Sequence, residues 1–288
     1  MNKTLKTILY ALTISFAVVP YNLFGNSDNP FKRYSENHSD CKIESETQQE
    51  NPDSIVYIAV GNHTIEMMYV KGGTYTMGCT DEQKDECWEF EEPAHIVTLD
   101  DFYIGKYEVT QGLWLEVMGN NPSIFTGNDS LPVENVSWDD CKKFIQKLNK
   151  MTGRNFRMPT EAEWEYAARG GKKSKKTKYS GSNNIDEVAW YWNRKEGAIS
   201  THKVGTKHPN ELGLYDMSGN VSEWCSDLYG KYKNFSQVNP TGSIYGSERI
   251  IRGGNCASTT RLCRVSYRTM TTPNTTINRI GLRLVLTK

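Results

Sequence analysis

Two helix signals, each with its own start and stop residues, constrain the fold of this chain more than any other feature. The segment VSWDDCKKFIQKLNKMTG opens with Ser137 as an N-cap, has Asp140 three positions later, and stops at Gly153. The segment RMPTEAEWEYAARGG has Thr160 as an N-cap and Glu163 at the third helical position, which together form a capping box. Because such patterns occupy a small part of 288 residues, the sequence predicts an α+β domain with many strands and loops.

Apolar segments outside these helices have the pattern of strands. The run IEMMYVKGGTYTMG is broken by Gly72-Gly73, which indicates a hairpin. The run HIVTLDDFYIGKYEVT indicates a second strand pair with its turn at Asp100-Asp101. The last third contains short strands and irregular loops, and no internal repeat is visible. With 7 Trp, 16 Tyr and 23 Gly, we expect one loop-rich domain from about residue 55 to residue 288, held by ring packing.

The first 54 residues have a different composition. Residues 1–25 combine two early lysines with an apolar run that is short for a membrane span, which is typical of a cleaved signal peptide. An uncleaved N-terminal anchor is the alternative. Residues 26–54 are polar and nearly free of aliphatic side chains, which predicts a disordered linker. We therefore expect a secreted or periplasmic protein whose mature chain has no transmembrane span.

The charge balance argues against several classes of function. Lys plus Arg and Asp plus Glu both number 34, so nothing favours a nucleic-acid partner or an anionic membrane surface. The basic run at residues 172–176 lies between glycines and is typical of a solvated loop. No Gly-x-Ser-x-Gly segment, phosphate loop or His-x3-His spacing is present. Glu161, Glu163 and Glu165 are not spaced to converge on one helix face, which argues against a carboxylate-pair hydrolase.

The seven cysteines allow several pairings. In an oxidising compartment thiols pair where geometry allows, and an odd number leaves at least one over. Cys41, in the polar segment, is the expected odd thiol. Cys79 and Cys87 are close enough in sequence for a local disulfide. Cys141 lies on the apolar face of the first predicted helix, and Cys256 either stays free or meets Cys141.

Several motifs, taken in order, resemble the formylglycine-generating enzyme family, also called the sulfatase-modifying factor family. They are MMYVKGGTYTMG, YIGKYEVTQGLW, PVENVSWDDC, RMPTEAEWEYAARGG, GLYDMSGNVSEWCSD, RIIRGGN and RIGLRLV, and they cover residues 65–286. The resemblance implies a C-type-lectin-like fold with little regular secondary structure. Family membership does not determine function. The family includes oxidases that make formylglycine from a sulfatase cysteine, and also non-catalytic partners, accessory domains and parts of surface or secretion assemblies.

The cysteine loop distinguishes these possibilities. In the oxidases a Cys-x4-Cys pair after the Gly-Gly dipeptide holds copper, and soft thiolates suit Cu(I). Here Gly253-Gly254 precedes Cys256 and Cys263 in a shorter loop with Cys-x6-Cys spacing. The resemblance therefore implies that neither thiol is at an oxidase position, so Cys256, Cys263 and copper belong only to an oxidase alternative. Relatives with a cysteine at the position of Cys263 imply instead a disulfide from Cys225 to Cys263.

The YDMSGNVSEW segment is a candidate calcium site. It offers Asp216, Asn220 and Glu223, and calcium takes six to eight oxygens, including backbone carbonyls. The resemblance implies ligands from the side chains of Asn220 and Glu223 and from the carbonyl of Val221. The alternative is a hydrogen-bonded turn with Trp224 in the core.

Together these features favour a non-oxidase binding or accessory module. We expect its lectin-like loop face to contact a peptide, a protein or a glycan, with Trp190 and Trp192 at the rim. Packing of these rings into the core is the alternative. Two other functions stay open: a protein oxidase with a rearranged cysteine loop, and a structural component of a surface or secretion assembly. Four arginines are expected to pair with carboxylates such as Glu163 or Glu223, namely Arg252, Arg264, Arg268 and Arg283.

Overall fold

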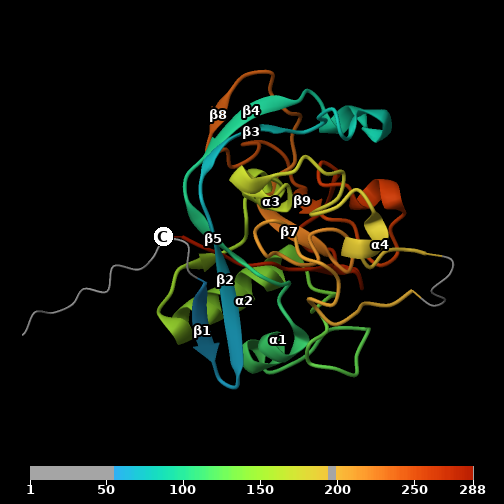
Figure 1. Cartoon of the computed structure of the whole chain (residues 1–288). Helices are drawn as coiled ribbons and strands as arrows, with labels where there is room; N and C mark the ends of the chain where they lie inside the picture. The colour runs from blue at the N-terminus through green and yellow to red at the C-terminus, as the bar shows by residue number, and fades with distance from the viewer. Residues whose placement is uncertain (1–54, 194–198, 288) are drawn as a thin grey trace, which may run out of the picture. The chain divides into compact units, whose positions relative to one another are not determined.

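Three small sheets carry the fold (Figure 1). The computed structural model describes residues 55–193 and 199–287, so the predicted signal peptide at 1–25, the linker at 26–54 and Cys41 lie outside the described residues. The strand orders are β1-β2-β5-β12-β6, β10-β9-β7-β11 and β3-β4-β8. The strands are β1 Val56–Val60, β2 His63–Val70, β3 Gly73–Met77, β4 His95–Leu99, β5 Phe102–Gly105, β6 Phe156–Arg157, β7 Ser222–Leu228, β8 Gln237–Val238, β9 Arg249–Arg252, β10 Arg268–Thr271, β11 Ile280–Gly281 and β12 Val285–Leu286.

Both predicted helices form at the expected residues. Ser137 caps α2, Thr160 caps α3, both capping boxes are present, and Gly153 ends α2 with a left-handed φ of 66°. The α-helices are α1 Gln111–Met118, α2 Trp138–Thr152, α3 Glu161–Ala168 and α4 Ile185–Val188, and the short 3-10 helices are η1 Lys84–Glu86, η2 Glu89–Glu91, η3 Gly171–Lys173 and η4 Thr260–Cys263. Among the described residues, no helix is long and apolar enough to cross a bilayer.

The strands predicted in residues 63–105 form, but the two predicted hairpins are wrong. Strand β2 pairs with β5, and β3 pairs with β4, so one antiparallel ribbon passes from one sheet into another. The carboxylate of Asp101 joins the two strands at this passage, because its Oδ1 accepts a hydrogen bond from Gly72 N at 2.9 Å. A Cβ at Gly72 would lie 2.3 Å from Leu99 O. Glycine at this position therefore permits a close crossing of two strands rather than a turn.

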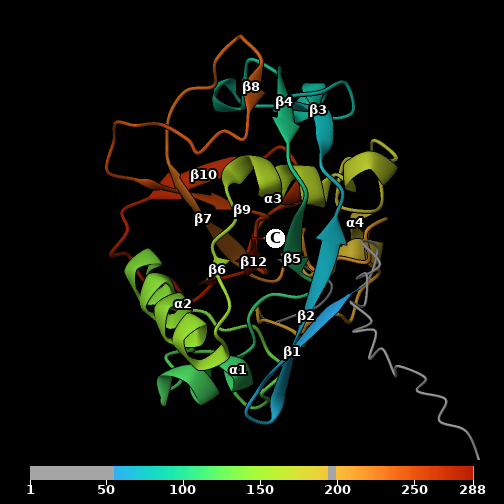
Figure 2. The same ribbon diagram turned by 90° about the vertical axis from the view of Figure 1, so that its left-hand side faces the viewer.

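Two large apolar clusters fill the domain. The first lies between the five-stranded sheet and α1 and α2, where Trp114 and Phe144 stack at 4.8 Å and Cys141 is buried, as predicted. The second surrounds α3, which contacts β3, β7 and β9. Figure 2 shows α1 and α2 together in the lower part of the domain and α3 in the upper part. A small third cluster, around α4, contains Cys263.

Candidate functional site

Asn220 connects three segments that are distant in sequence. Its N–H donates to Trp190 O at 2.7 Å, and its carbonyl accepts from Cys256 N at 2.9 Å. Its side-chain Oδ1 accepts from His202 N at 3.0 Å. The preceding residue, Gly219, has φ 86°, and a Cβ there would lie 2.3 Å from Trp190 O. The tertiary structure thus brings the Trp190 segment, the GNVSEW loop and the cysteine loop into one loop face.

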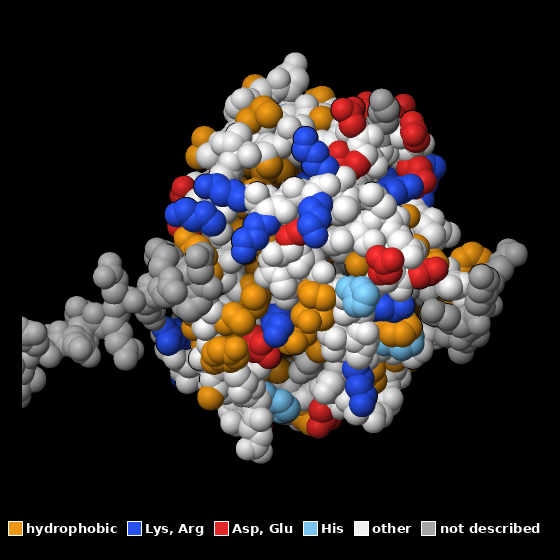
Figure 3. All heavy atoms as spheres, in the orientation of Figure 1, with side chains coloured by type: hydrophobic (Ala, Val, Ile, Leu, Met, Phe, Trp, Pro, Cys, Tyr) orange, Lys and Arg blue, Asp and Glu red, His pale blue; other side chains and the backbone are white. Residues whose placement is uncertain are grey.

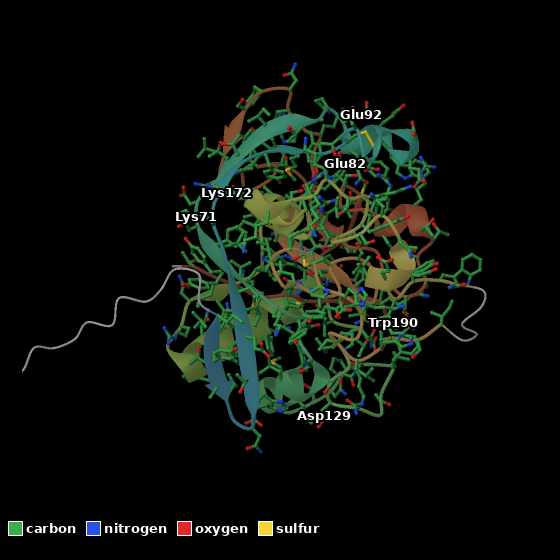
Figure 4. The ribbon with its side chains drawn as sticks, in the orientation of Figure 1. Lys71, Glu82, Glu92, Asp129, Lys172 and Trp190 are labelled. Carbon is green, nitrogen blue, oxygen red and sulfur yellow. A yellow bond between two sulfur atoms is a disulfide. The ribbon has the colours of Figure 1, made fainter. Side chains whose placement is uncertain are left out.

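The two tryptophans expected at the rim have different environments. The indole of Trp190 stacks on the His202 ring at 3.7 Å, and Lys207 Nζ lies 4.1 Å from the indole centroid. Trp192 is 39% exposed, and its backbone N–H donates to Ser258 O at 2.9 Å. Figure 4 shows Trp190 on the right-hand side of the domain. The Trp190 ring is therefore partly buried and stacked, whereas the Trp192 ring is exposed beside the cysteine loop.

Cys256 and Cys263 are both buried, with exposures of 3% and 0%. Burial, as the main cause, raises the pKa of each thiol to about 12. Cys263 packs with apolar residues of the α4 region, and its pKa is lowered somewhat by a hydrogen bond from the backbone of Asn255. Because the thiolate is the nucleophile, neither thiol is activated by its protein surroundings alone at neutral pH.

The disulfide predictions have mixed outcomes. Cys79 and Cys87 are joined, as predicted. The predicted bond between Cys225 and Cys263 is absent, because both are free buried thiols. The reason is packing: Cys225 belongs to the apolar cluster around α3, whereas Cys263 belongs to the separate cluster around α4. Cys256 and Cys141 are also unpaired.

The side chains that were expected to bind calcium already form hydrogen bonds or ion pairs with other protein groups. Both carboxylate oxygens of Glu223 accept from Arg283, and Trp164 Nε1 donates to Glu223 Oε2 at 2.6 Å. The Asn220 side chain is likewise occupied, and among the described residues no group of three His, Cys, Asp or Glu side chains could hold a metal ion. Asp216 keeps one buried oxygen without a hydrogen-bond partner. The side-chain oxygens of Asn220 and Glu223 thus already accept hydrogen bonds from protein groups, and we assign no chemistry to calcium.

Glu108 is a site residue that sequence reasoning missed. Its carboxylate accepts from Asn220 Nδ2 at 2.6 Å and from Val221 N at 3.0 Å, so it positions the GNVSEW loop. Burial raises the pKa of Glu108 well above its usual value, and the neighbouring Asp216 and Glu223 raise it further. The signal in the sequence was a carboxylate three residues after the end of an apolar strand, in YIGKYEVT.

The four arginines form structural ion pairs, as predicted, but with partly different carboxylates. Arg283 pairs with Glu223, whereas Glu163 pairs with Arg157 instead. The other pairs are Arg252–Glu165, Arg264–Glu91 and Arg268–Glu161. The expectation that the α3 glutamates diverge is also wrong in part. Glu161 and Glu165 are one turn apart, and both lie within salt-bridge distance of Arg252.

Comparison with known proteins agrees with this geometry. Residues 58–288 match the model of the sulfatase-modifying factor enzyme 1-like domain. The chain is 38% identical over 240 residues to the chaperone protein LppX of Paenibacillus barcinonensis, covering 67% of this chain and 82% of that protein. It is 33% identical to the formylglycine-generating enzyme of Streptomyces coelicolor, over 59% of each chain.

A solved structure extends the agreement to the fold. The Treponema denticola variable protein 1 superimposes with a TM-score of 0.74 at 30% identity, over 81% of this chain and 99% of that one. Its alignment spans nearly all of the described residues, with their mixture of small sheets and short helices. This chain therefore belongs to the formylglycine-generating enzyme, or sulfatase-modifying factor, family and has its C-type-lectin-like α+β fold.

Proposed function

We propose that this protein is an extracytoplasmic binding or accessory module that does not act as an oxidase. The observation that carries this proposal is the state of the cysteine loop, where Cys256 and Cys263 are buried and their pKa values are raised to about 12. An oxidase needs two thiols that bind copper together and that a substrate cysteine can reach. Two thiols that are buried under the loop face, at Cys-x6-Cys rather than Cys-x4-Cys spacing, suit a packing role better.

The loop face supplies the contact surface in this proposal. It combines the exposed Trp192 ring with the stack of Trp190 and His202, and the cation of Lys207 covers part of that stack. Aromatic rings with a few fixed polar groups suit a peptide, a protein loop or a glycan. Calcium is left out of this surface because protein groups already occupy Asn220 and Glu223. A relative named as a chaperone is consistent with an accessory role.

Two observations support a location outside the cytoplasm. Disulfides persist in oxidising compartments, and Cys79 and Cys87 form one. The apolar segment near the N-terminus, within residues 1–25, has the composition of a signal peptide. Secretion or export to a periplasm accounts for both.

An oxidase is the second candidate, favoured by 33% identity to the Streptomyces coelicolor formylglycine-generating enzyme. The deciding experiment incubates the copper-loaded protein with a Cys-x-Pro-x-Arg peptide and measures formylglycine by mass spectrometry. We expect no conversion by the wild type, and non-reducing peptide mapping should find Cys225 and Cys263 as free thiols. Conversion that disappears in Cys256→Ser and Cys263→Ser variants would establish the oxidase and refute the binding proposal.

A further inference from the structure

A second surface, far from the loop face, has the features of a protein-binding site. We propose that it binds a segment of another protein in which an apolar side chain is flanked by acidic residues. We call it the β8 surface and define it by the side chains that form it, Lys231, Lys233, Phe235, Val238, Ile244 and Tyr245. Strand β8 lies at the upper left of Figure 1, whereas Figure 4 shows Trp190 at the lower right. This inference names a partner class for a site that the proposed function does not use.

Large apolar side chains gather on the β8 surface. Phe235, Val238, Ile244 and Tyr245 are between 60% and 83% exposed. Ile96 adds to them, because β4 runs beside β8 and the exposed Ile96 precedes Val97, the partner of Gln237. Figure 3 shows apolar side chains over this upper edge of the domain. Single exposed apolar residues are ordinary, but several large ones on neighbouring segments indicate an interaction surface.

A cavity of about 370 Å³ lies beneath this surface. Ile244 and Tyr245 stand on its rim, and Met77, Ala162 and Tyr232 form apolar parts of its wall. A pocket under an exposed apolar rim is the arrangement in which an interface holds an anchoring side chain.

The two carboxyl groups at the floor of the cavity already accept hydrogen bonds from protein groups. Glu161 accepts hydrogen bonds from Arg268 Nε and Nη2, both at 2.7 Å, and from the Tyr232 hydroxyl at 3.1 Å. Asp227 accepts from Glu161 N at 3.1 Å and from the Ser226 hydroxyl at 2.8 Å. A charged anchor would compete with these contacts, so the cavity suits an uncharged, apolar side chain.

Two lysines at the mouth specify the flanking residues of the partner. Lys231 and Lys233 both line the cavity and are exposed, and within the described residues neither forms a salt bridge. Free cations around an apolar pocket attract carboxylates and repel other cations. A second copy of this chain is disfavoured, because a symmetric contact would bring the same lysines together. The aliphatic character of Val238 and Ile244 also suits a polypeptide better than a sugar ring.

The test uses the whole secreted chain and random 12-residue peptides displayed on phage. Selection on the wild type is compared with selection on an Ile244→Asp/Tyr245→Asp variant. We expect the wild type alone to enrich peptides in which aromatic or aliphatic residues are flanked by Asp and Glu. A fluorescein-labelled synthetic copy of the strongest peptide then gives Kd values by fluorescence polarisation.

Charge reversal identifies the determinant of this binding. Lys231→Glu/Lys233→Glu should weaken binding of the acidic peptide about tenfold or more, because the opposite charges become like charges. The same variant should bind a peptide whose acidic residues are replaced by lysine better than the wild type does. Matched controls at exposed positions elsewhere are Tyr57→Asp in β1 and Lys147→Glu/Lys150→Glu in α2, which should leave both Kd values unchanged.

Three outcomes would overturn the proposal. In the first, the wild type and the Ile244→Asp/Tyr245→Asp variant select the same peptides. In the second, the wild type enriches basic or uncharged peptides. In the third, the wild type associates with itself and the variant does not. A Trp192→Ala variant separates this site from the loop face, since it should leave the selected peptides and their Kd values unchanged. If the β8 surface selects no such peptides, the proposed function still stands. If the protein forms formylglycine, the proposal for the β8 surface still stands.

Discussion

The arginine network around α3 and the loop face around Asn220 both bury polar groups, but they neutralise charge differently. In the network, each of Arg252, Arg264 and Arg268 has a glutamate partner. On the loop face, the carboxylates of Glu108 and Asp216 form no salt bridge with any described residue, and burial raises the pKa of both. Arg283 is the nearby cation and is bonded to Glu223.

This difference shows what each region does for the domain. The network joins helix α3, strands β9 and β10 and the segment between β3 and β4, so it holds sequence-distant elements in one arrangement. The loop face relies on hydrogen bonds from Asn220 and Glu108, which determine the path of loops. Paired buried charges hold α3 and the strands in one arrangement, whereas directional hydrogen bonds fix the loops at the surface.

The largest effect should come from breaking a buried pair of the network. Arg264 and Glu91 are both fully buried and share two hydrogen bonds, at 2.6 and 2.9 Å. Arg264→Ala leaves an unpaired buried carboxylate, which should lower the free energy of unfolding by about 3–5 kcal/mol in chemical denaturation. Lys143→Ala, which breaks an exposed pair with Asp140, should cost less than about 1 kcal/mol. Equal costs for the two variants would contradict the network's role.

A carboxylate without an arginine partner should behave differently from the paired ones. Burial, as the main cause, raises the pKa of Asp227 to about 7, above its value in the unfolded chain. The folded state then binds the extra proton, so stability is full below about pH 4 and is lost as pH rises through about 7. Asp227→Asn should remove roughly 2–4 kcal/mol of this pH dependence, measured by urea unfolding between pH 4 and 8. An unchanged slope in the variant would mean that Asp227 titrates normally.

A smaller effect is expected at Gly219, where the GNVSEW loop contacts the Trp190 segment. Gly219→Ala places a methyl group against the carbonyl of Trp190 at a left-handed φ, so it should cost about 1–3 kcal/mol. The change should also alter Trp190 fluorescence, because the stack with His202 depends on this contact. Gly153→Ala has a left-handed φ without a close neighbour and is the matched control. If both variants show the same fluorescence, the contact does not position Trp190.

Local signals predicted helices α2 and α3 well. The capping boxes that begin with Ser137 and Thr160 placed α2 and α3, because the side chains that satisfy the first N–H groups lie three residues apart in the chain. The short spacing of Cys79 and Cys87 likewise indicated their disulfide. The hairpins at Gly72 and Asp101 were wrong because sequence cannot distinguish a turn glycine from one required where two strands cross.

The sequence alone determined the family, the α+β class, the boundaries of α2 and α3, the burial of Cys141 and the local disulfide, since these depend on short-range patterns and on motif order. Only the tertiary structure decided that Cys225 and Cys263 lie in separate clusters and that Glu108 holds the Asn220 loop. It also decided that Glu161 and Glu165 meet the arginines of β9 and β10. The physical reason is that burial and ion pairing depend on contacts between residues far apart in the chain, and spacing along the sequence does not encode those distances.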